Sequence, residues 1–140
     1  IIDDVKNIVR ALGLAKIKKL VIYVYPKEAY EILRIAIERS EKGLRDMIAI
    51  LKDLGIPADK AAIISKRAIK FVRELDPEIR DLVKRVRIDE ASVLHELRDY
   101  IVKELGVEHL EVYLATDKQA IDFGNKKFAG IPLRPGIYIE

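Results

Sequence analysis

With 140 residues, of which 50% are hydrophobic and 35% charged, the chain has the size and composition of one folded globular domain. It contains no cysteine and only two histidines, which excludes disulfides, thiolate metal sites and cysteine nucleophiles and argues against a histidine metal cage. The 26 basic and 23 acidic residues leave a net charge of +3, which by itself selects no partner. No apolar run is long enough to cross a membrane, and residues 1–5 are not typical of a signal peptide. We therefore expect a cytoplasmic protein.

Helical and strand patterns alternate in the N-terminal half of the chain. Apolar residues at helical spacing predict a helix over 3–12 that ends at Gly13. The β-branched and aromatic run at 19–25, closed by Pro26, predicts a buried strand. A 3.6-residue period then returns and predicts three further helices, over 27–39, over 42–54 and from the turn at 56–59 to Leu75.

The C-terminal half continues with helices and ends in strands. Asp76 and Pro77 are a typical helix start, and Asp89 is a second candidate N-cap. The predicted elements are helices over 77–87 and 89–105, a strand over 110–115, a looser connection over 116–130 and a final strand over 136–140. The sequence therefore predicts an α+β fold, with a small mixed sheet of two to three strands covered by several helices.

The sequence carries none of the common catalytic motifs: no glycine-rich phosphate loop, no G-x-S-x-G elbow and no H-E-x-x-H pair. His95 lies within a predicted helix beside leucines, which favours a partly buried structural histidine, and His109 precedes a strand at the surface. Tyr23 and Tyr25 share one face of the first strand, where packing in the core is favoured over base stacking. We therefore expect no catalytic residue, no metal site and no cofactor in this chain.

Two stretches, 58–73 and 118–134, are rich in basic residues and poor in acidic ones. In the first stretch, three basic side chains fall along one side of the predicted helix, where they could follow a nucleic-acid backbone. Such a stripe fits binding to a polyanion, and it also fits a solvated helix face. The candidate phosphate-binding residues are Lys66, Lys70 and Arg73 in the first stretch and Lys126, Lys127 and Arg134 in the second.

Two segments resemble the C-terminal region of archaeal and eukaryotic-type leucyl-tRNA synthetases. The segment 15–25, Ala-Lys-Ile-Lys-Lys-Leu-Val-Ile-Tyr-Val-Tyr, is similar to the helix-to-strand entry that follows the anticodon-binding helical bundle of this family. The segment 132–140, Pro-Leu-Arg-Pro-Gly-Ile-Tyr-Ile-Glu, is similar to the family's ending, where a proline-containing turn leads into a short apolar strand. The resemblance implies that residues 1–14 end a preceding helical segment and that residues 15–140 form a C-terminal tRNA-binding domain.

The resemblance also implies a function for this domain. The parent enzyme activates leucine with ATP and magnesium and transfers it to tRNA, at a catalytic site that lies outside this fragment. In the archaeal type, the C-terminal domain reaches toward the long variable arm of leucine tRNA. Carried over by position, Ile137, Tyr138, Ile139 and Glu140 would lie near exposed bases of that arm, while Lys and Arg hold phosphates. In the other interpretation, the two isoleucines complete a sheet and Tyr138 packs on it.

Two other functional classes stay open at this point: a protein–protein interaction module without RNA binding, and a small-molecule regulatory domain. Salt dependence separates RNA binding from apolar docking, because only phosphate contacts weaken steeply as salt rises. We expect a monomer that binds neither a membrane nor a metal. Because chain termini are the parts of a domain held least stably, we also expect deletion of 137–140 to affect tRNA discrimination more than folding.

Overall fold

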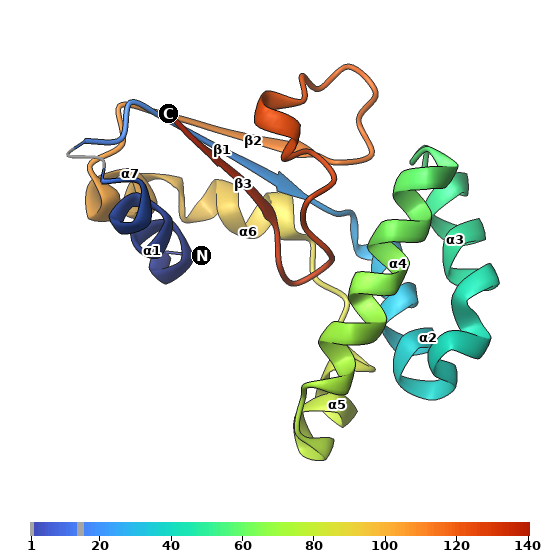
Figure 1. The fold of residues 1–140 in the computed structure, drawn as a ribbon. Coiled ribbons are helices and arrows are strands. Elements are labelled where there is room, and N and C mark those ends of the chain that lie inside the picture. Colours follow the sequence, from blue (N-terminus) through green and yellow to red (C-terminus); the bar gives the residue numbers. More distant parts are fainter. Residues whose placement is uncertain (1, 14–15) are drawn as a thin grey trace.

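The computed structural model describes residues 2–13 and 16–140, so the predicted domain boundary between residues 14 and 15 lies outside the described residues. Three strands form one mixed sheet in the order β2-β1-β3 (Figure 1). The central strand, β1 (Lys19–Val24), runs parallel to β2 (His109–Leu114) and antiparallel to β3 (Gly136–Ile139). A parallel pair cannot be joined by a tight turn, and the connection between β1 and β2 contains most of the helices.

One face of the sheet is covered by helices. The helices α1 (Ile2–Leu12), α6 (Glu90–Glu96) and α7 (Arg98–Leu105) lie along this face (Figure 1). Because side chains alternate along a strand, β1 presents every second apolar residue to these helices. The core on this side consists of Val5, Ile17, Leu20, Ile22, Val24, Leu94, Ile101, Val107 and Leu110, with Ile137 and Ile139 packed against it.

The opposite face of the sheet is covered by the segment 116–130, which includes the 3₁₀ turn η3 (Phe123–Asn125). Tyr23 on this face is fully buried, and its hydroxyl accepts a hydrogen bond of 2.9 Å from the Phe123 backbone N–H. The rings of Phe123 and Tyr138 stack with their centroids 5.4 Å apart. Aromatic contacts therefore hold this irregular segment on the sheet.

The remaining elements form an all-helical part beside the sheet (Figure 1). They are η1 (Lys27–Tyr30), α2 (Glu31–Arg39), η2 (Ser40–Gly43), α3 (Leu44–Asp53), α4 (Ala58–Arg73) and α5 (Pro77–Val83). The longest of them, α4, packs against both α2 and α3, so that its inner side is buried. The core that these helices share extends to Tyr25, Ala115 and Ile131. These residues connect it with the sheet and with the C-terminal segment (residues 126–140).

The predicted α+β fold with a small mixed sheet is confirmed. The prediction of one continuous helix over 89–105 is wrong, because the chain leaves helical geometry at Leu97, where φ is −90° and ψ is 2°. Leu94 and Ile101, one on each side of the break, both pack in the core under the sheet. The helix predicted over 77–87 is also shorter, since α5 ends at Val83.

Three local predictions have different outcomes. The carboxylate of Asp89 caps α6 by accepting a 3.2 Å hydrogen bond from the Ser92 backbone N–H, as predicted. Asp76 precedes α5 but its side chain makes no capping hydrogen bond. The prediction of a partly buried His95 is wrong. The buried residues of α6 are Glu90 and Leu94, and His95 is exposed.

The carboxylate of Glu90 joins the sheet, the helical part and the C-terminal segment. The residue is 8% exposed, and one carboxylate oxygen accepts from the Tyr25 backbone N–H at 3.0 Å. The other oxygen accepts from the Tyr30 hydroxyl at 2.5 Å and from the Leu133 backbone N–H at 2.9 Å. A buried carboxylate is tolerated only where donors surround it, and here three donors come from three separate segments.

The free energy of unfolding is expected to fall as the pH rises above about 10. The pKa of Tyr25 is raised above its ordinary value mainly by burial and, to a smaller extent, by the neighbouring Glu90 carboxylate. The pKa of Tyr30 is raised mainly by burial and, to a smaller extent, by its hydrogen bond to Glu90. A phenol whose pKa is raised by folding contributes its full stabilisation below the pKa of the unfolded chain. That contribution is lost above it, by up to about 1.4 kcal/mol per pH unit for each phenol.

Urea unfolding at about pH 8, 10 and 11 measures this loss. Tyr25→Phe removes one of the phenols whose pKa folding raises, so we expect a smaller decline between about pH 10 and 11. Tyr100→Phe is the matched control, because Tyr100 is 58% exposed. A decline that is the same in Tyr25→Phe as in the parent chain would contradict this account.

Candidate nucleic-acid interface

The basic residues predicted in the first stretch lie on α4, where Lys66, Lys70 and Arg73 are all exposed. The Arg73 guanidinium donates to the Glu41 carboxylate and, at 2.8 Å, to the Ser40 hydroxyl. This hydrogen bond from Arg73 lowers the pKa of the Glu41 carboxyl. The charge of Arg73 is thus partly balanced, whereas Lys66 and Lys70 form no ion pair with the part of the chain that the structure describes.

The three basic residues predicted in the second stretch have two different environments. Lys126 and Arg134 are exposed. Lys127 is only 7% exposed, and its ammonium donates to the carbonyl oxygens of Asp117 at 2.7 Å and Ala120 at 3.2 Å. Because these carbonyls already occupy the ammonium inside its own loop, the geometry argues against the phosphate contact predicted for Lys127.

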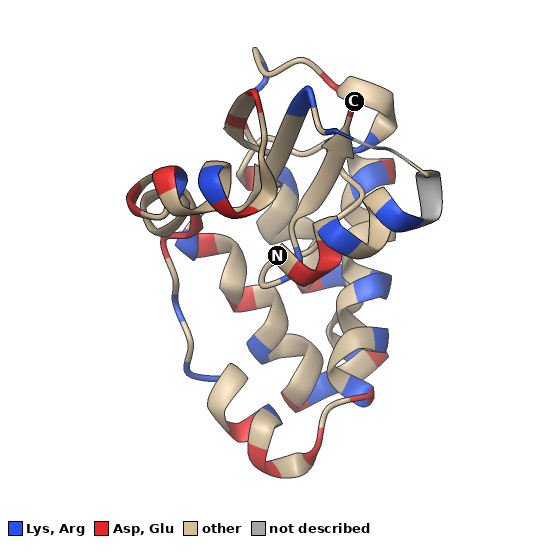
Figure 2. Cartoon of the chain, turned by 90° about the vertical axis from the view of Figure 1, so that its left-hand side faces the viewer, with Lys and Arg blue, Asp and Glu red and all other residues tan. Residues whose placement is uncertain are grey.

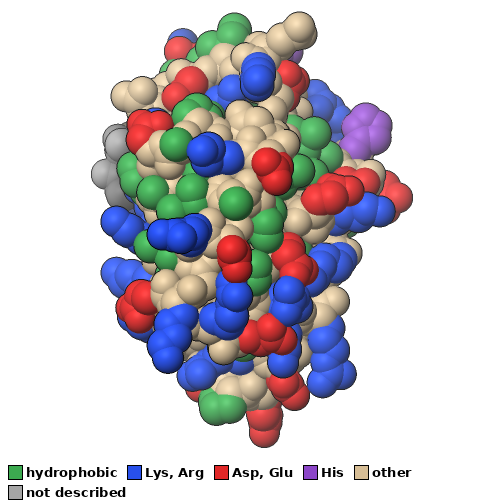
Figure 3. All heavy atoms as spheres, turned by 90° about the vertical axis from the view of Figure 1, so that its right-hand side faces the viewer, with side chains coloured by type: hydrophobic (Ala, Val, Ile, Leu, Met, Phe, Trp, Pro, Cys, Tyr) green, Lys and Arg blue, Asp and Glu red, His purple; other side chains and the backbone are tan. Residues whose placement is uncertain are grey.

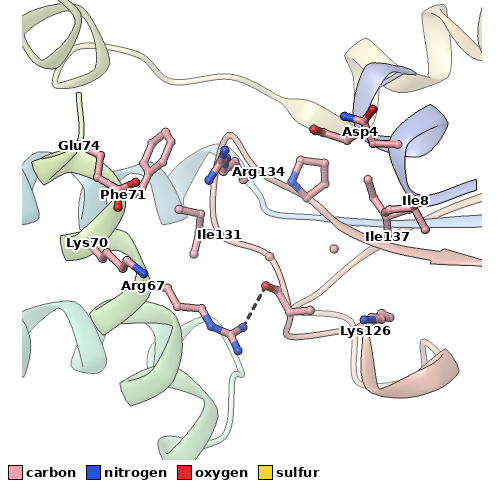
Figure 4. A pocket seen from close by; sticks show the side chains of 15 residues that line it. Asp4, Ile8, Arg67, Lys70, Phe71, Glu74, Lys126, Ile131, Arg134 and Ile137 are labelled. Atoms are coloured by element: carbon pink, nitrogen blue, oxygen red, sulfur yellow. Dashed lines mark hydrogen bonds between the residues drawn. The ribbon is translucent and has the colours of Figure 1, made fainter. Parts of the chain in front are cut away.

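An open cleft of about 590 Å³ brings the two basic stretches together. Its walls are α4, α1 and the C-terminal segment, which lies between the two helices (Figure 4). Arg67 and Lys70 stand on the α4 wall, and Lys126 and Arg134 stand on the C-terminal segment. Apolar residues line much of the remainder, among them Ile8, Phe71, Ile131, Pro135 and Ile137. Lys66 and Arg73 lie on the same helix but do not line the cleft.

Arg67 connects two walls of this cleft, a role that its sequence position does not indicate. Its guanidinium donates to the carbonyl oxygens of Ala129 at 2.9 Å and Phe128 at 3.3 Å, and the first bond is the dashed line in Figure 4. The bond joins α4 to residues that follow more than 60 positions later. The sequence pattern of a basic helix predicts only a solvent-exposed cation at this position, so only the tertiary structure identifies this contact.

The turn at 131–134 sets the position of Arg134. Ile131 and Arg134 exchange backbone hydrogen bonds of 2.8 and 2.9 Å, and Leu133 adopts a left-handed φ of 76°. This conformation costs a non-glycine residue roughly 1 kcal/mol. The hydrogen bond from the Leu133 N–H to Glu90 offsets this cost. Gly130 is required beside the turn, since a Cβ atom there would lie 2.3 Å from the backbone nitrogen of Gly136.

The predicted base-reading residues form β3 and its end. The side chains of Ile137 and Ile139 are half-buried and pack against the core beneath the sheet, which agrees with the interpretation that they complete the sheet. Tyr138 lies on the other face, where it stacks on an aromatic ring of the covering segment. Glu140 is exposed, and its backbone carbonyl accepts hydrogen bonds of 2.9 and 3.1 Å from two backbone amides at the start of β1.

Positive and negative side chains are mixed over the surface that the figures draw. Figure 2 shows Lys and Arg alternating with Asp and Glu along the helices. The face drawn in Figure 3 likewise carries both signs of charge and is not uniformly basic. The cleft itself combines four cationic side chains with two acidic ones, Asp4 and Glu74. The concentration of cations is therefore a local property of the cleft.

Two further classes of site were assessed over the described residues. No group of three or more His, Cys, Asp or Glu side chains there comes together as a metal site. Within residues 2–13 and 16–140, no helix combines the length and the apolar character needed to cross a bilayer.

The whole chain aligns with leucine–tRNA ligases of archaea. It is 39% identical over 141 residues to that of Pyrobaculum aerophilum, 37% identical over 141 residues to that of Pyrobaculum calidifontis and 32% identical over 140 residues to that of Pyrococcus abyssi. The resemblance to archaeal leucyl-tRNA synthetases is confirmed. Each alignment covers 100% of this chain but 13% of the relative, so the chain spans about an eighth of the length of these enzymes. No protein-family model matches the chain. No solved structure matches it significantly.

Proposed function

We propose that this chain is the C-terminal tRNA-binding domain of a leucyl-tRNA synthetase. The parent enzyme joins leucine to tRNA with ATP and magnesium, at a catalytic site outside this chain. The observation that carries the proposal is the convergence of Arg67, Lys70, Lys126 and Arg134 on one cleft. The similarity to archaeal leucine–tRNA ligases supports leucine tRNA as the RNA in this proposal. The domain acts in the cytoplasm and as a monomer.

The cleft and the exposed side of α4 form one cationic track in this proposal. Lys66 precedes Lys70 by one helical turn, so the two ammonium groups extend the charge of the cleft along the helix. Both lysines are exposed, and an RNA phosphate can displace their counterions. Arg73 contributes less, because Glu41 already balances part of its charge, and Lys127 contributes to the loop alone.

Discrimination of leucine tRNA by its long variable arm is assigned to the end of β3. Glu140 is exposed there, and its side-chain carboxylate could accept from the exocyclic amino groups of bases. Tyr138 lies beside it on the sheet face that the helices do not cover. The side chains of Ile137 and Ile139 pack against the core under the sheet, so these residues contribute to recognition by holding β3 in position.

A protein–protein interaction module is the second candidate. The observation that favours it is three exposed apolar side chains in α6, in α7 and at the break between them: Val93, Tyr100 and Leu97 are 44%, 58% and 45% exposed. Docking through these side chains would depend weakly on salt, whereas RNA binding through the cleft weakens steeply between low and physiological salt. Binding of the chain to leucine tRNA as a function of salt therefore separates the two candidates.

Charge reversal on α4 is expected to weaken RNA binding without changing its specificity. For the double variant Lys66→Glu and Lys70→Glu, we expect an affinity loss of about tenfold or more and a slope of log affinity against log salt reduced by about two units. The loss should be equal for leucine tRNA and for a tRNA with a short variable arm, because phosphate contacts carry no sequence information. Filter binding or fluorescence anisotropy over a salt series provides the measurement.

Lys52→Glu on α3 is the control for this experiment, because it reverses an exposed charge on a helix that does not line the cleft. We expect it to change affinity by less than about twofold. If the double variant keeps the parent affinity and salt slope, α4 is a solvated helix face and the cationic track is refuted.

A further inference from the structure

We propose that the cleft binds one unpaired nucleotide of an RNA, with its base stacked on the guanidinium of Arg134. This inference rests on the proposed function, because it assumes that the chain binds RNA. It adds a site for a base formed mainly by side chains of α4, α1 and the turn at 131–134, apart from Tyr138 and Glu140, which do not line the cleft.

Arg134 has the geometry of a stacking platform. Its guanidinium carbon lies over the Phe71 ring, 5.4 Å from the ring centroid, so the planar group has an aromatic side chain beside it. Arg134 is exposed and lines the cleft, so a ligand in the cleft can reach its guanidinium (Figure 4). Arginine stacks on bases as well as on aromatic rings, and a base stacked on the guanidinium would complete a layered arrangement with Phe71.

The platform is held in place by its backbone. Arg134 is the last residue of the turn whose ends exchange two hydrogen bonds, and Leu133 within the turn is bonded to the buried Glu90. Arg67 ties the chain just before this turn to α4, the helix that carries Phe71. The backbone that carries Arg134 and the helix that carries Phe71 are thus held together before any ligand binds, which reduces the entropy that binding must remove.

The other lining residues provide what a nucleotide requires besides stacking. The cleft volume of about 590 Å³ lies in the range of small-molecule sites. Lys70 and Lys126 flank the cleft and are placed to hold the phosphates on either side of an extruded base. Asn7 of α1 lines it as well, and its exposed amide has the donor and acceptor pair that matches adenine.

The experiment compares three RNA hairpins of equal length: one with a single bulged adenosine, one with an abasic ribose at the bulge, and one fully paired. We expect the parent chain to bind the adenosine bulge about tenfold more tightly than the abasic bulge, since a stacked base contributes on this scale. In Arg134→Lys this difference should fall below about twofold while the salt slope stays unchanged, because lysine keeps the charge but lacks the planar group.

Arg45→Lys is the matched control, since Arg45 is an exposed arginine of α3 outside the cleft. Phe71→Leu is a second variant that removes the lower layer of the stack and leaves all cations in place. No salt-dependent binding to any hairpin would overturn the proposed function together with this inference. Equal binding of the adenosine and abasic bulges, or an undiminished difference in Arg134→Lys, would overturn the inference alone.

Discussion

Removal of Ile137–Glu140 is expected to lower the free energy of unfolding by about 4 kcal/mol or more. The deletion takes away β3, which pairs with β1 along Leu20–Tyr23. It also exposes the core under the sheet where Ile137 and Ile139 pack, and it removes the ring on which Phe123 stacks. Domains of this size are stable by only about 5–15 kcal/mol, so such a loss is large.

This expected loss of stability differs from the expectation, drawn from the sequence, that the chain end matters more for recognition than for folding. Thermal unfolding followed by circular dichroism measures it, with Glu140→Gln as the control, because Glu140 is exposed and its backbone bonds stay intact. A truncated chain that unfolds within a few degrees of the parent would contradict the role of β3 in stability. Since truncation perturbs the fold, Glu140→Gln is also the variant that tests recognition of the variable arm.

Replacement of Glu90 by glutamine is expected to lower the free energy of unfolding by about 2–3 kcal/mol. The two carboxylate oxygens accept from the backbone N–H groups of Tyr25 and Leu133, one on each side. Glutamine has one oxygen and one amino group, so either orientation points N–H groups at one of these backbone donors. The size of the side chain is unchanged, which separates this effect from the loss of packing.

Glu96→Gln provides the comparison, because Glu96 is an exposed residue on the same helix. We expect it to change the free energy of unfolding by less than about 0.5 kcal/mol. Chemical unfolding of both variants gives the two values. Equal stability of Glu90→Gln and the parent would mean that the three hydrogen bonds do not hold the segments together. Because Leu133 precedes Arg134, the same variant should also weaken binding of the bulged hairpin.

Much of the secondary structure could be predicted from local patterns. The run at 19–25 between polar residues and Pro26 predicts β1, and periodicity predicts α2, α3 and α4. The break at Leu97 could not be predicted, since 89–105 is compatible with one helix by propensity. Leu94 and Ile101, on either side of the break, both pack in the core under the sheet.

The candidate site was only partly predictable for a related reason. Composition identifies Lys70 and Arg134 as members of two basic stretches, but it does not indicate that these stretches meet. Lys127 also belongs to the second basic stretch but has a different role, because the fold of its loop brings two backbone carbonyls to its ammonium. Arg67 and Phe71 give no signal of their own, since their partners are distant in the sequence.

The sequence by itself determined the fold class, the main elements and the resemblance to leucyl-tRNA synthetases, because periodicity, turn residues and the terminal nonapeptide are local features. Only the tertiary structure decided the strand order, with β1 between two strands that follow it far along the chain. It also decided the cleft. Side-chain contacts such as Arg67 to Ala129 and Leu133 to Glu90 join positions tens of residues apart, and their partners are set by packing of the whole chain.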